Sequence, residues 1–126
     1  MITIIQDAPE NVAAFRASGQ VTKDDFENVV LPHVKAKVEI YDELNYLFHL
    51  DTKLEEFTTG AWMQDAWLGI KNLTKWNRCA IISDEEGIHK FTETFNKLMI
   101  GEFKAFTTAQ IGIAAKWCET GEEFVI

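Results

Sequence analysis

The sequence predicts an α/β fold, in which a mostly parallel sheet of five strands starts with an antiparallel hairpin and carries four helices. Short runs rich in β-branched and aromatic residues alternate with longer stretches whose apolar residues recur at helical spacing. The resulting order, ββαβαβαβα, contains strand–helix–strand units, which join parallel strands through right-handed crossovers. The first strand is therefore expected at an edge of the sheet, antiparallel to its neighbour.

The chain opens with two short β-like runs. They are MITIIQ at 1–6 and NVAAFRASG at 11–19, separated by DAPE at 7–10, whose proline and acidic flanks are typical of a turn. Parallel strands need a much longer connection than this. We therefore expect the two runs to pair as a hairpin.

The first helix is predicted to follow Thr22. The Thr22 hydroxyl can cap the helix and Asp25 stands at the third helical position, while Val21 and Phe26 occupy the two positions of a hydrophobic staple. Its apolar residues recur every four positions, at Phe26, Val30, Val34 and Val38. Pro32 lacks an amide and crowds the preceding turn, so we expect a kink there.

The next strand, ELNYLFHLD at 43–51, is apolar on both faces and is expected in the middle of the sheet. Its alternation gives one face made of Tyr46, Phe48 and Leu50 and another made of Leu47 and His49. A helix is predicted from about Gly60 to Lys75. Its broad apolar face consists of Trp62, Met63, Ala66, Trp67, Ile70 and Leu73.

The fourth strand is RCAIIS at 78–83, and Ser83 with Glu86 has the spacing of a capping box in front of the next helix. Gly101 is expected to end that helix. Its apolar face consists of Ile88, Phe91, Phe95, Leu98 and Met99.

The last strand is EFKAF at 102–106, and Thr107 with Gln110 again has capping-box spacing. The helix that follows is expected to end at Gly121. Its inward face consists of Ile113, Ala114 and Trp117.

The composition is that of a globular protein. Hydrophobic residues make up 47% and charged residues 25% of the 126 residues, a length that predicts one domain over 1–126. The net charge of −8 argues against nucleic acid or an anionic membrane surface as a partner. No apolar stretch approaches the about 20 residues of a membrane span, and the first residues lack signal-peptide features. We therefore expect a cytoplasmic protein.

The two cysteines, Cys79 and Cys118, are expected to be free and buried. Neither belongs to a CxxC motif or has a neighbouring histidine. The sequence therefore predicts no disulfide and no cysteine-bound metal.

Three segments carry a family resemblance. They are ASGQVTKDDFENVVLPHV, LFHLDTKLEEFTTGAW and AAKW. In this order they resemble the STAS domain of SpoIIAA-type anti-sigma factor antagonists over nearly the whole chain, which implies a SpoIIAA-like fold, a fold class shared with CRAL-TRIO lipid-binding domains. In the antagonists, a phosphorylated serine or threonine lies in an Asp-Ser-Ser-Gly-like motif at the start of the second helix. Thr58, Thr59 and Gly60 match that motif, and Phe57 replaces its acidic residue.

Two roles are open for Thr58 and Thr59. A phosphate here would be stabilised by free amides and by the positive end of the helix dipole. Glu55 and Glu56 would repel it, and no arginine is near in the sequence. A threonine at a helix start also caps the helix by accepting an amide hydrogen bond. We favour capping, and regulatory phosphorylation is the functional alternative.

The aromatic helix faces are the second candidate site. An apolar pocket or groove could be lined by Trp62, Met63, Trp67, Phe91, Phe95 and Met99. A helix that covers a sheet needs such a face in any case. A protein partner or a second copy of the chain could also bind there. Core packing, a small apolar or lipid-like ligand and a protein interface all remain open.

His49 and Asp51 are a weaker polar candidate. They alternate onto one side of the third strand at its carboxyl end, where open α/β sheets bind ligands. The spacing reveals no third metal ligand and no nucleophile, so we favour a buried histidine that is hydrogen-bonded to a neighbour. His33 and His89 lie on predicted helices without partners at ligand spacing. We expect no catalytic residue, metal or cofactor.

The function predicted from these features is a non-catalytic regulatory or protein-interaction module of the STAS-like type. It would act through the surface of residues 51–62 and the helix that follows. The alternative, implied by the kinship with CRAL-TRIO domains, is a binder of a small apolar or lipid-like molecule between the second and third helices.

Overall fold

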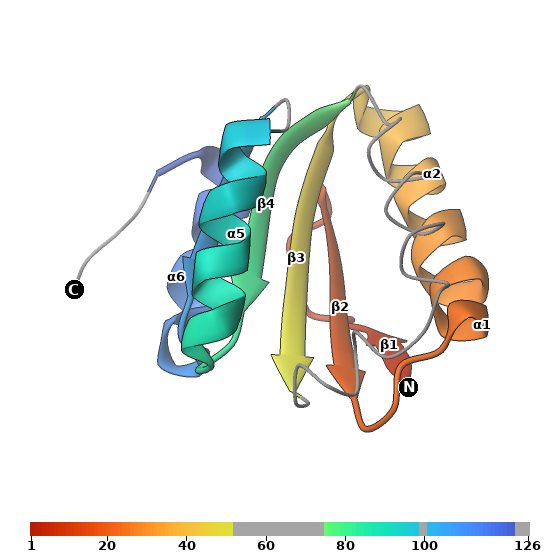
Figure 1. The fold of residues 1–126 in the computed structure, drawn as a ribbon. Helices are drawn as coiled ribbons and strands as arrows, with labels where there is room; N and C mark the ends of the chain where they lie inside the picture. Colours follow the sequence, from red (N-terminus) through yellow and green to blue (C-terminus); the bar gives the residue numbers. More distant parts are fainter. Residues whose placement is uncertain (52–74, 99–100, 123–126) are drawn as a thin grey trace.

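The computed structural model describes residues 1–51, 75–98 and 101–122, and in these residues the strands form one sheet in the order β1-β2-β3-β4-β5 (Figure 1). β1 is antiparallel to β2, and the remaining neighbours are parallel. The strands are β1 (Ile2–Ile4), β2 (Val12–Ser18), β3 (Leu44–Asp51), β4 (Trp76–Ile82) and β5 (Glu102–Phe106). The predicted α/β class and the antiparallel edge strand are confirmed.

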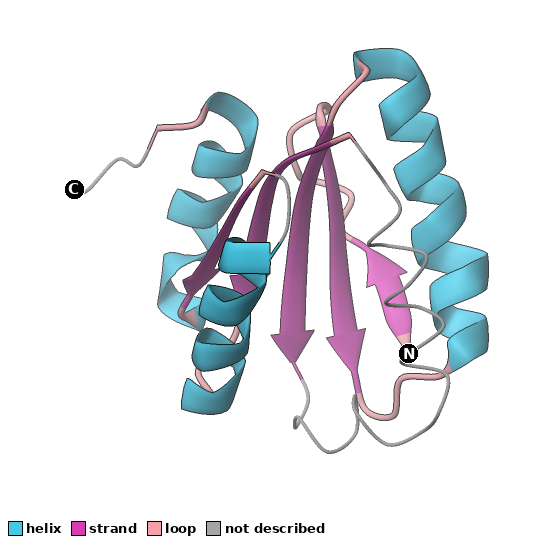
Figure 2. Ribbon diagram, turned by 45° about the horizontal axis from the view of Figure 1, so that its top comes forward, coloured by secondary structure: helices cyan, strands magenta, loops and turns pink. Residues whose placement is uncertain are grey.

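Helices lie on both sides of the sheet (Figure 2). The described helical segments are α1 (Lys23–Asp25), η1 (Phe26–Val30), α2 (Leu31–Tyr41), α5 (Glu86–Leu98), η2 (Thr108–Gln110) and α6 (Ile111–Thr120). The helix predicted over 60–75 falls outside the described residues. None of the described helices has the length and apolar character needed to cross a membrane.

Two hydrophobic cores cover the two faces of the sheet. On one face, Phe26, Val30 and Val34 pack with the side chains of β2 and β3, among them Phe15, Tyr46 and Phe48. On the other face, α6 packs on the sheet through Ala114, Trp117 and Cys118, and the sheet contributes Leu47, Ala80 and Ile82. β3 therefore supplies both cores, as its two apolar faces predicted.

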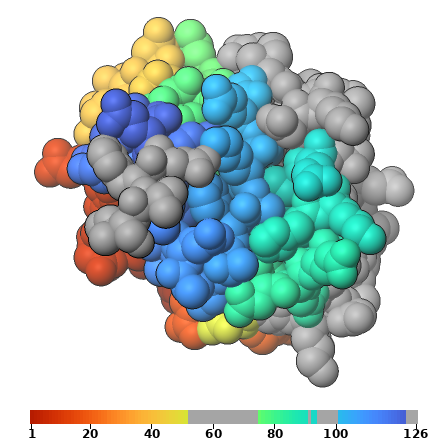
Figure 3. All heavy atoms as spheres, turned by 90° about the vertical axis from the view of Figure 1, so that its left-hand side faces the viewer, coloured from red at the N-terminus to blue at the C-terminus, as the bar shows by residue number. Residues whose placement is uncertain are grey.

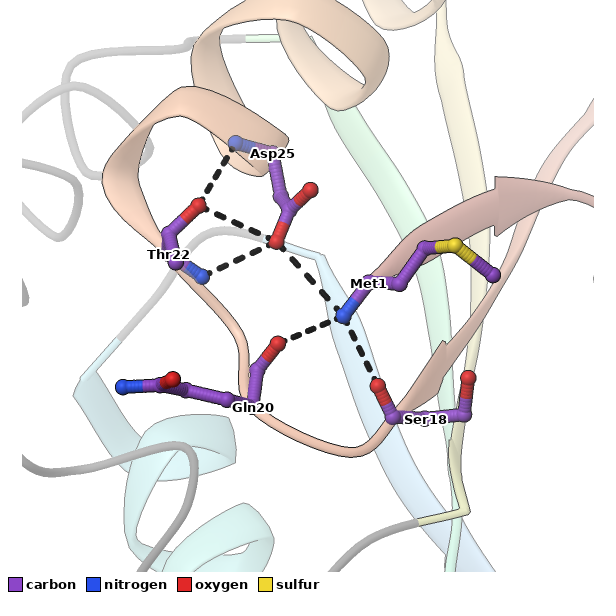
Figure 4. A network of polar contacts seen from close by, with 5 residues as sticks. All are labelled: Met1, Ser18, Gln20, Thr22 and Asp25. Atoms are coloured by element: carbon purple, nitrogen blue, oxygen red, sulfur yellow. Dashed lines mark hydrogen bonds and ion pairs between the residues drawn. The ribbon is translucent and has the colours of Figure 1, made fainter.

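The helix start at Thr22 has the predicted capping box. The Asp25 amide donates to Thr22 Oγ1 at 3.2 Å, and the Thr22 amide donates to Asp25 Oδ2 at 3.0 Å. The amino group of Met1 donates to the carbonyls of Ser18 (2.7 Å) and Gln20 (2.5 Å) and lies 3.6 Å from Asp25 Oδ2 (Figure 4). These contacts connect the start of the edge strand to the start of the helix.

Beyond the cap, the helix has a π-helical segment, η1, where the kink was expected. The Leu31 amide donates to the carbonyl of Phe26, five residues back. Pro32 has no amide and would clash with the Asn28 carbonyl in a continuous α-helix, so a wider turn before it relieves this conflict. The apolar stripe is kept, because the buried residues include Phe26, Val30 and Val34.

The capping box predicted for Ser83 and Glu86 is wrong. The Ser83 amide, which Glu86 would have bonded, donates to the carbonyl of Phe106 at 2.9 Å and extends the pairing of β4 with β5. Ser83 Oγ accepts the Glu85 amide at 3.1 Å. Glu86 instead lies 3.6 Å from the Lys90 ammonium, one turn along α5.

The predicted start and end of the last helix are confirmed. The Thr107 amide donates to Gln110 Oε1 at 2.9 Å in a capping box. Gly121 ends α6 with a φ of 82°, in the left-handed region that favours glycine. Cys79 and Cys118 are free and buried, as predicted, and burial raises the pKa of Cys118 to about 12.

Replacing Asp25 with alanine should lower the free energy of unfolding at pH 7 by about 1 kcal/mol, because it removes half of the capping box. Asp24→Ala is the matched control, since Asp24 lies in the same turn and is exposed. Denaturant unfolding of both variants and the wild type measures the difference. Equal losses in the two variants would contradict this role of Asp25.

The stabilisation by Asp25 should also depend on pH. Partial burial raises the pKa of Asp25, but the hydrogen bonds from Thr22 and the nearby Met1 amino group outweigh it and lower the pKa below 3.8. A carboxyl group whose pKa is lowered in the folded state stabilises the fold when the pH is above the pKa that the group has in the unfolded chain. This stabilisation is lost as the pH falls through the folded-state pKa. The difference in the free energy of unfolding between wild type and Asp25→Ala should therefore have its full size at pH 7 and shrink below pH 3.8. Denaturant unfolding at several pH values measures it.

Candidate functional site

Polar side chains gather where β2, β3 and β4 end. Because these strands are parallel, their carboxyl ends share one edge of the sheet, the edge where open α/β sheets bind ligands. We call these residues the carboxyl-edge cluster: Arg16, His49, Asp51, Asp84 and His89. They come from β2, β3, the connection after β4, and α5.

Arg16 and Asp51 form an ion pair between β2 and β3. The Arg16 guanidinium donates to Asp51 Oδ2, and the two side chains are 51% and 49% exposed. Arg16 stands opposite His49 in the register, so it reaches two residues along β3 to Asp51. The hydrogen bond and charge of Arg16, with a smaller effect of His49, lower the pKa of Asp51. The pair therefore holds the ends of the two strands together and keeps Asp51 ionised.

Asp84 connects the end of β4 to the start of the last helix. Its Oδ1 accepts the Thr108 amide at 2.8 Å, at the first residue of η2. The hydrogen bonds from Thr108, followed by the charges of His49 and His89, lower the pKa of Asp84. A carboxylate at this position bonds a helix-start amide that has no partner within the helix.

His89 bonds back to the loop that precedes its own helix. Its Nε2 lies 2.7 Å from the carbonyl oxygen of Ser83. A carbonyl can only accept, so Nε2 carries the proton and donates it. This bond joins α5 to the end of β4, which gives His89 a structural role.

His49 is half-buried, so the predicted full burial is wrong. The predicted hydrogen bond to a neighbour stays a prediction, since no hydrogen bond to the ring is found within the described part of the chain. His49 is close enough to Asp51 and Asp84 for its charge to lower both pKa values.

His33 has a packing role. Its ring stands edge-on to Phe15, with the ring centres 5.4 Å apart. Burial, with a smaller effect of Lys37, lowers the pKa of His33. Among residues 1–51, 75–98 and 101–122, no three His, Cys, Asp or Glu side chains are grouped so that they could hold a metal ion.

The other predicted sites fall outside what the structure describes. This applies to the proposed regulatory loop at Thr58, Thr59 and Gly60, to Met99, and to Trp62, Met63 and Trp67. Phe91 and Phe95 lie in α5, but their side chains are not described. The apolar pocket, the lipid-like ligand and the interface for a partner or a second copy therefore stay predictions.

Arg16 and Asp84 were missed by the sequence analysis. Arg16 meets Asp51 only because of the parallel register of β2 and β3, and Asp84 meets Thr108 across 24 residues. Neither pairing has a local sequence signal. The alternation of β2 could have placed Arg16 on the same face as Val12 and Ala14, but it does not identify the partner strand.

The Thr108 amide provides a direct test of the Asp84 contact. In a pH titration followed by ¹H–¹⁵N NMR, its chemical shift should change with a midpoint below 3.8, since the pKa of Asp84 is lowered. Asp84→Asn should abolish this low-pH step, because the amide side chain does not titrate in this range. A step that persists in the variant, or a wild-type midpoint at or above 3.8, would contradict the contact.

Comparison with known proteins agrees with this fold. The family model described as SpoIIAA-like matches residues 12–119, from the start of β2 to the last turn of α6. A crystal structure from Shewanella loihica PV-4, described as an uncharacterized protein from the DUF3478 family with a SpoIIAA-like fold, is 27% identical, with a TM-score of 0.62 over 93% of each chain. No curated protein gave a significant match. The predicted resemblance is confirmed: the chain belongs to the SpoIIAA-like family.

Proposed function

We propose that this chain is a non-catalytic regulatory module of the STAS-like type that acts by binding a partner protein. The observation that carries the proposal is the use of the polar side chains at the carboxyl edge. Asp51 bonds Arg16, Asp84 bonds the Thr108 amide, and His89 bonds the Ser83 carbonyl. Each contact joins two elements of the fold, which is a structural use of residue types that an enzyme would need for its chemistry.

Among the described residues, the remaining candidates for catalysis also lack the required neighbours. A catalytic constellation needs a nucleophile or acid–base group, a partner that orients it, and room for a substrate beside both. Ser83 is buried, and its hydroxyl oxygen accepts the Glu85 amide. His49 has no orienting hydrogen bond from the residues that the structure describes. These features favour binding over catalysis.

We place the binding surface at residues 51–62 and the helix that follows. Asp51 is where β3 ends, and its ion pair with Arg16 anchors the start of this segment at an exposed edge of the sheet. The carboxyl ends of parallel strands are where sheets of this kind bind ligands. Within this proposal, Thr58 or Thr59 would be the position at which phosphorylation changes partner affinity.

The test is recovery of partners from the native cells with tagged wild-type and variant proteins. Trp62→Ala and Thr58→Glu should each abolish or strongly reduce recovery of the same partner, through loss of apolar contact and through added charge. Ile40→Ala is the matched control for an apolar residue, because Ile40 is 71% exposed at the end of α2. Circular dichroism of each variant checks that the fold is kept.

A folded Trp62→Ala protein and a folded Thr58→Glu protein that recover every partner as the wild type does would refute this placement. Equal loss in Ile40→Ala would refute it as well, since the effect would then not be local to residues 51–62.

A further inference from the structure

β5 is an edge strand whose outer side carries backbone hydrogen-bonding groups. It pairs with β4, and no other strand of the described residues adjoins it. The Ser83 amide donates to the Phe106 carbonyl, so Phe106 turns its backbone toward β4. Successive residues of a strand point their backbone groups to alternate sides. Ala105 therefore directs its amide and carbonyl away from β4, toward the outer edge.

A depression of about 330 Å³ lies along this edge. Residues 103–106 of β5 line it, together with His89, Thr92 and Glu93 of α5 on one side and Gln110 on another. Phe103 and Phe106 belong to opposite faces of the sheet, so the depression follows the edge of the strand rather than one face. In Figure 3, which views this side, the surfaces of α5 and of residues 101–122 adjoin.

Two acidic residues, Glu93 in the lining of the depression and Glu102 at the start of β5, lie on this side of the sheet. Glu93 is exposed on the α5 wall and has no ion pair within the described part of the chain, and Glu102 is exposed at the start of β5. The Lys104 ammonium is turned toward α6, where it lies 5.0 Å from the centre of the Trp117 ring. With a net charge of −8 on the whole chain, this edge attracts a positively charged occupant.

We propose that the edge of β5 binds an extended, basic segment of a partner protein as a sixth strand. The Ala105 amide and carbonyl would form the ladder bonds, and Glu93 would pair with a Lys or Arg side chain of the segment. A second copy of this chain also carries −8, and its repulsion disfavours it as the occupant. The proposed site is made of residues of β5 and α5 and not of residues 51–62, so it extends the proposed function and does not rest on it.

The experiment selects short random peptides displayed on phage against the full chain and measures the affinity of the enriched peptides. They should carry Lys or Arg at alternate positions. Ala105→Pro should weaken binding by about tenfold, since it removes the outward amide but no bond to β4. Glu93→Gln should also weaken it, whereas Glu39→Gln, an exposed carboxylate change on α2, should leave affinity unchanged. Hydrogen exchange of the Ala105 amide should slow when the peptide binds.

Failure to enrich any peptide would overturn the proposal. Enriched peptides that bind Glu93→Gln as tightly as the wild type would also overturn it. Glu93→Gln changes an exposed side chain, so this test holds even if Ala105→Pro does not fold. If the wild type forms a dimer and Ala105→Pro abolishes it, the edge binds a second copy of the chain. This result would also overturn the proposal that a basic segment of a partner protein binds there.

Discussion

The burial of β3 on both faces is the constraint on which the rest of this structure depends. Tyr46 and Phe48 belong to the core with η1 and α2, and Leu47 to the core with α6. Side chains alternate between faces, so a strand that is apolar throughout is stable only between two covering layers. With β2 and β4 as its parallel neighbours, β3 carries its carboxyl end, with His49 and Asp51, to an exposed edge of the sheet.

The proposed binding surfaces are placed where the apolar covering of the sheet stops. Past Phe48, β3 becomes half-buried and then exposed, and at its end Asp51 forms an ion pair with Arg16. Within the described residues, β5 forms the other margin of the sheet, where the backbone groups of Ala105 face outward beside Glu93. The two proposed binding surfaces start from these two margins of the described sheet.

Local signals in the sequence predicted most of the fold, and long-range contacts account for what it did not predict. The capping boxes at Thr22 and Thr107 form because their partners are three residues away. The one at Ser83 does not form, because the Phe106 carbonyl takes the amide that it needs. The burial of His49 was also predicted wrongly, because the exposure of a strand residue depends on the elements that pack over it and not on the sequence of the strand.

Native-state hydrogen exchange of the backbone amides, followed by NMR, tests this account most directly. If the sheet is organised around β3, the amides of Tyr46, Leu47 and Phe48 exchange only through global unfolding, and those of the edge strand β1 exchange through smaller openings. If the β3 amides exchange as readily as those of β1, the doubly covered central strand is contradicted, and with it the placement of the carboxyl-edge cluster.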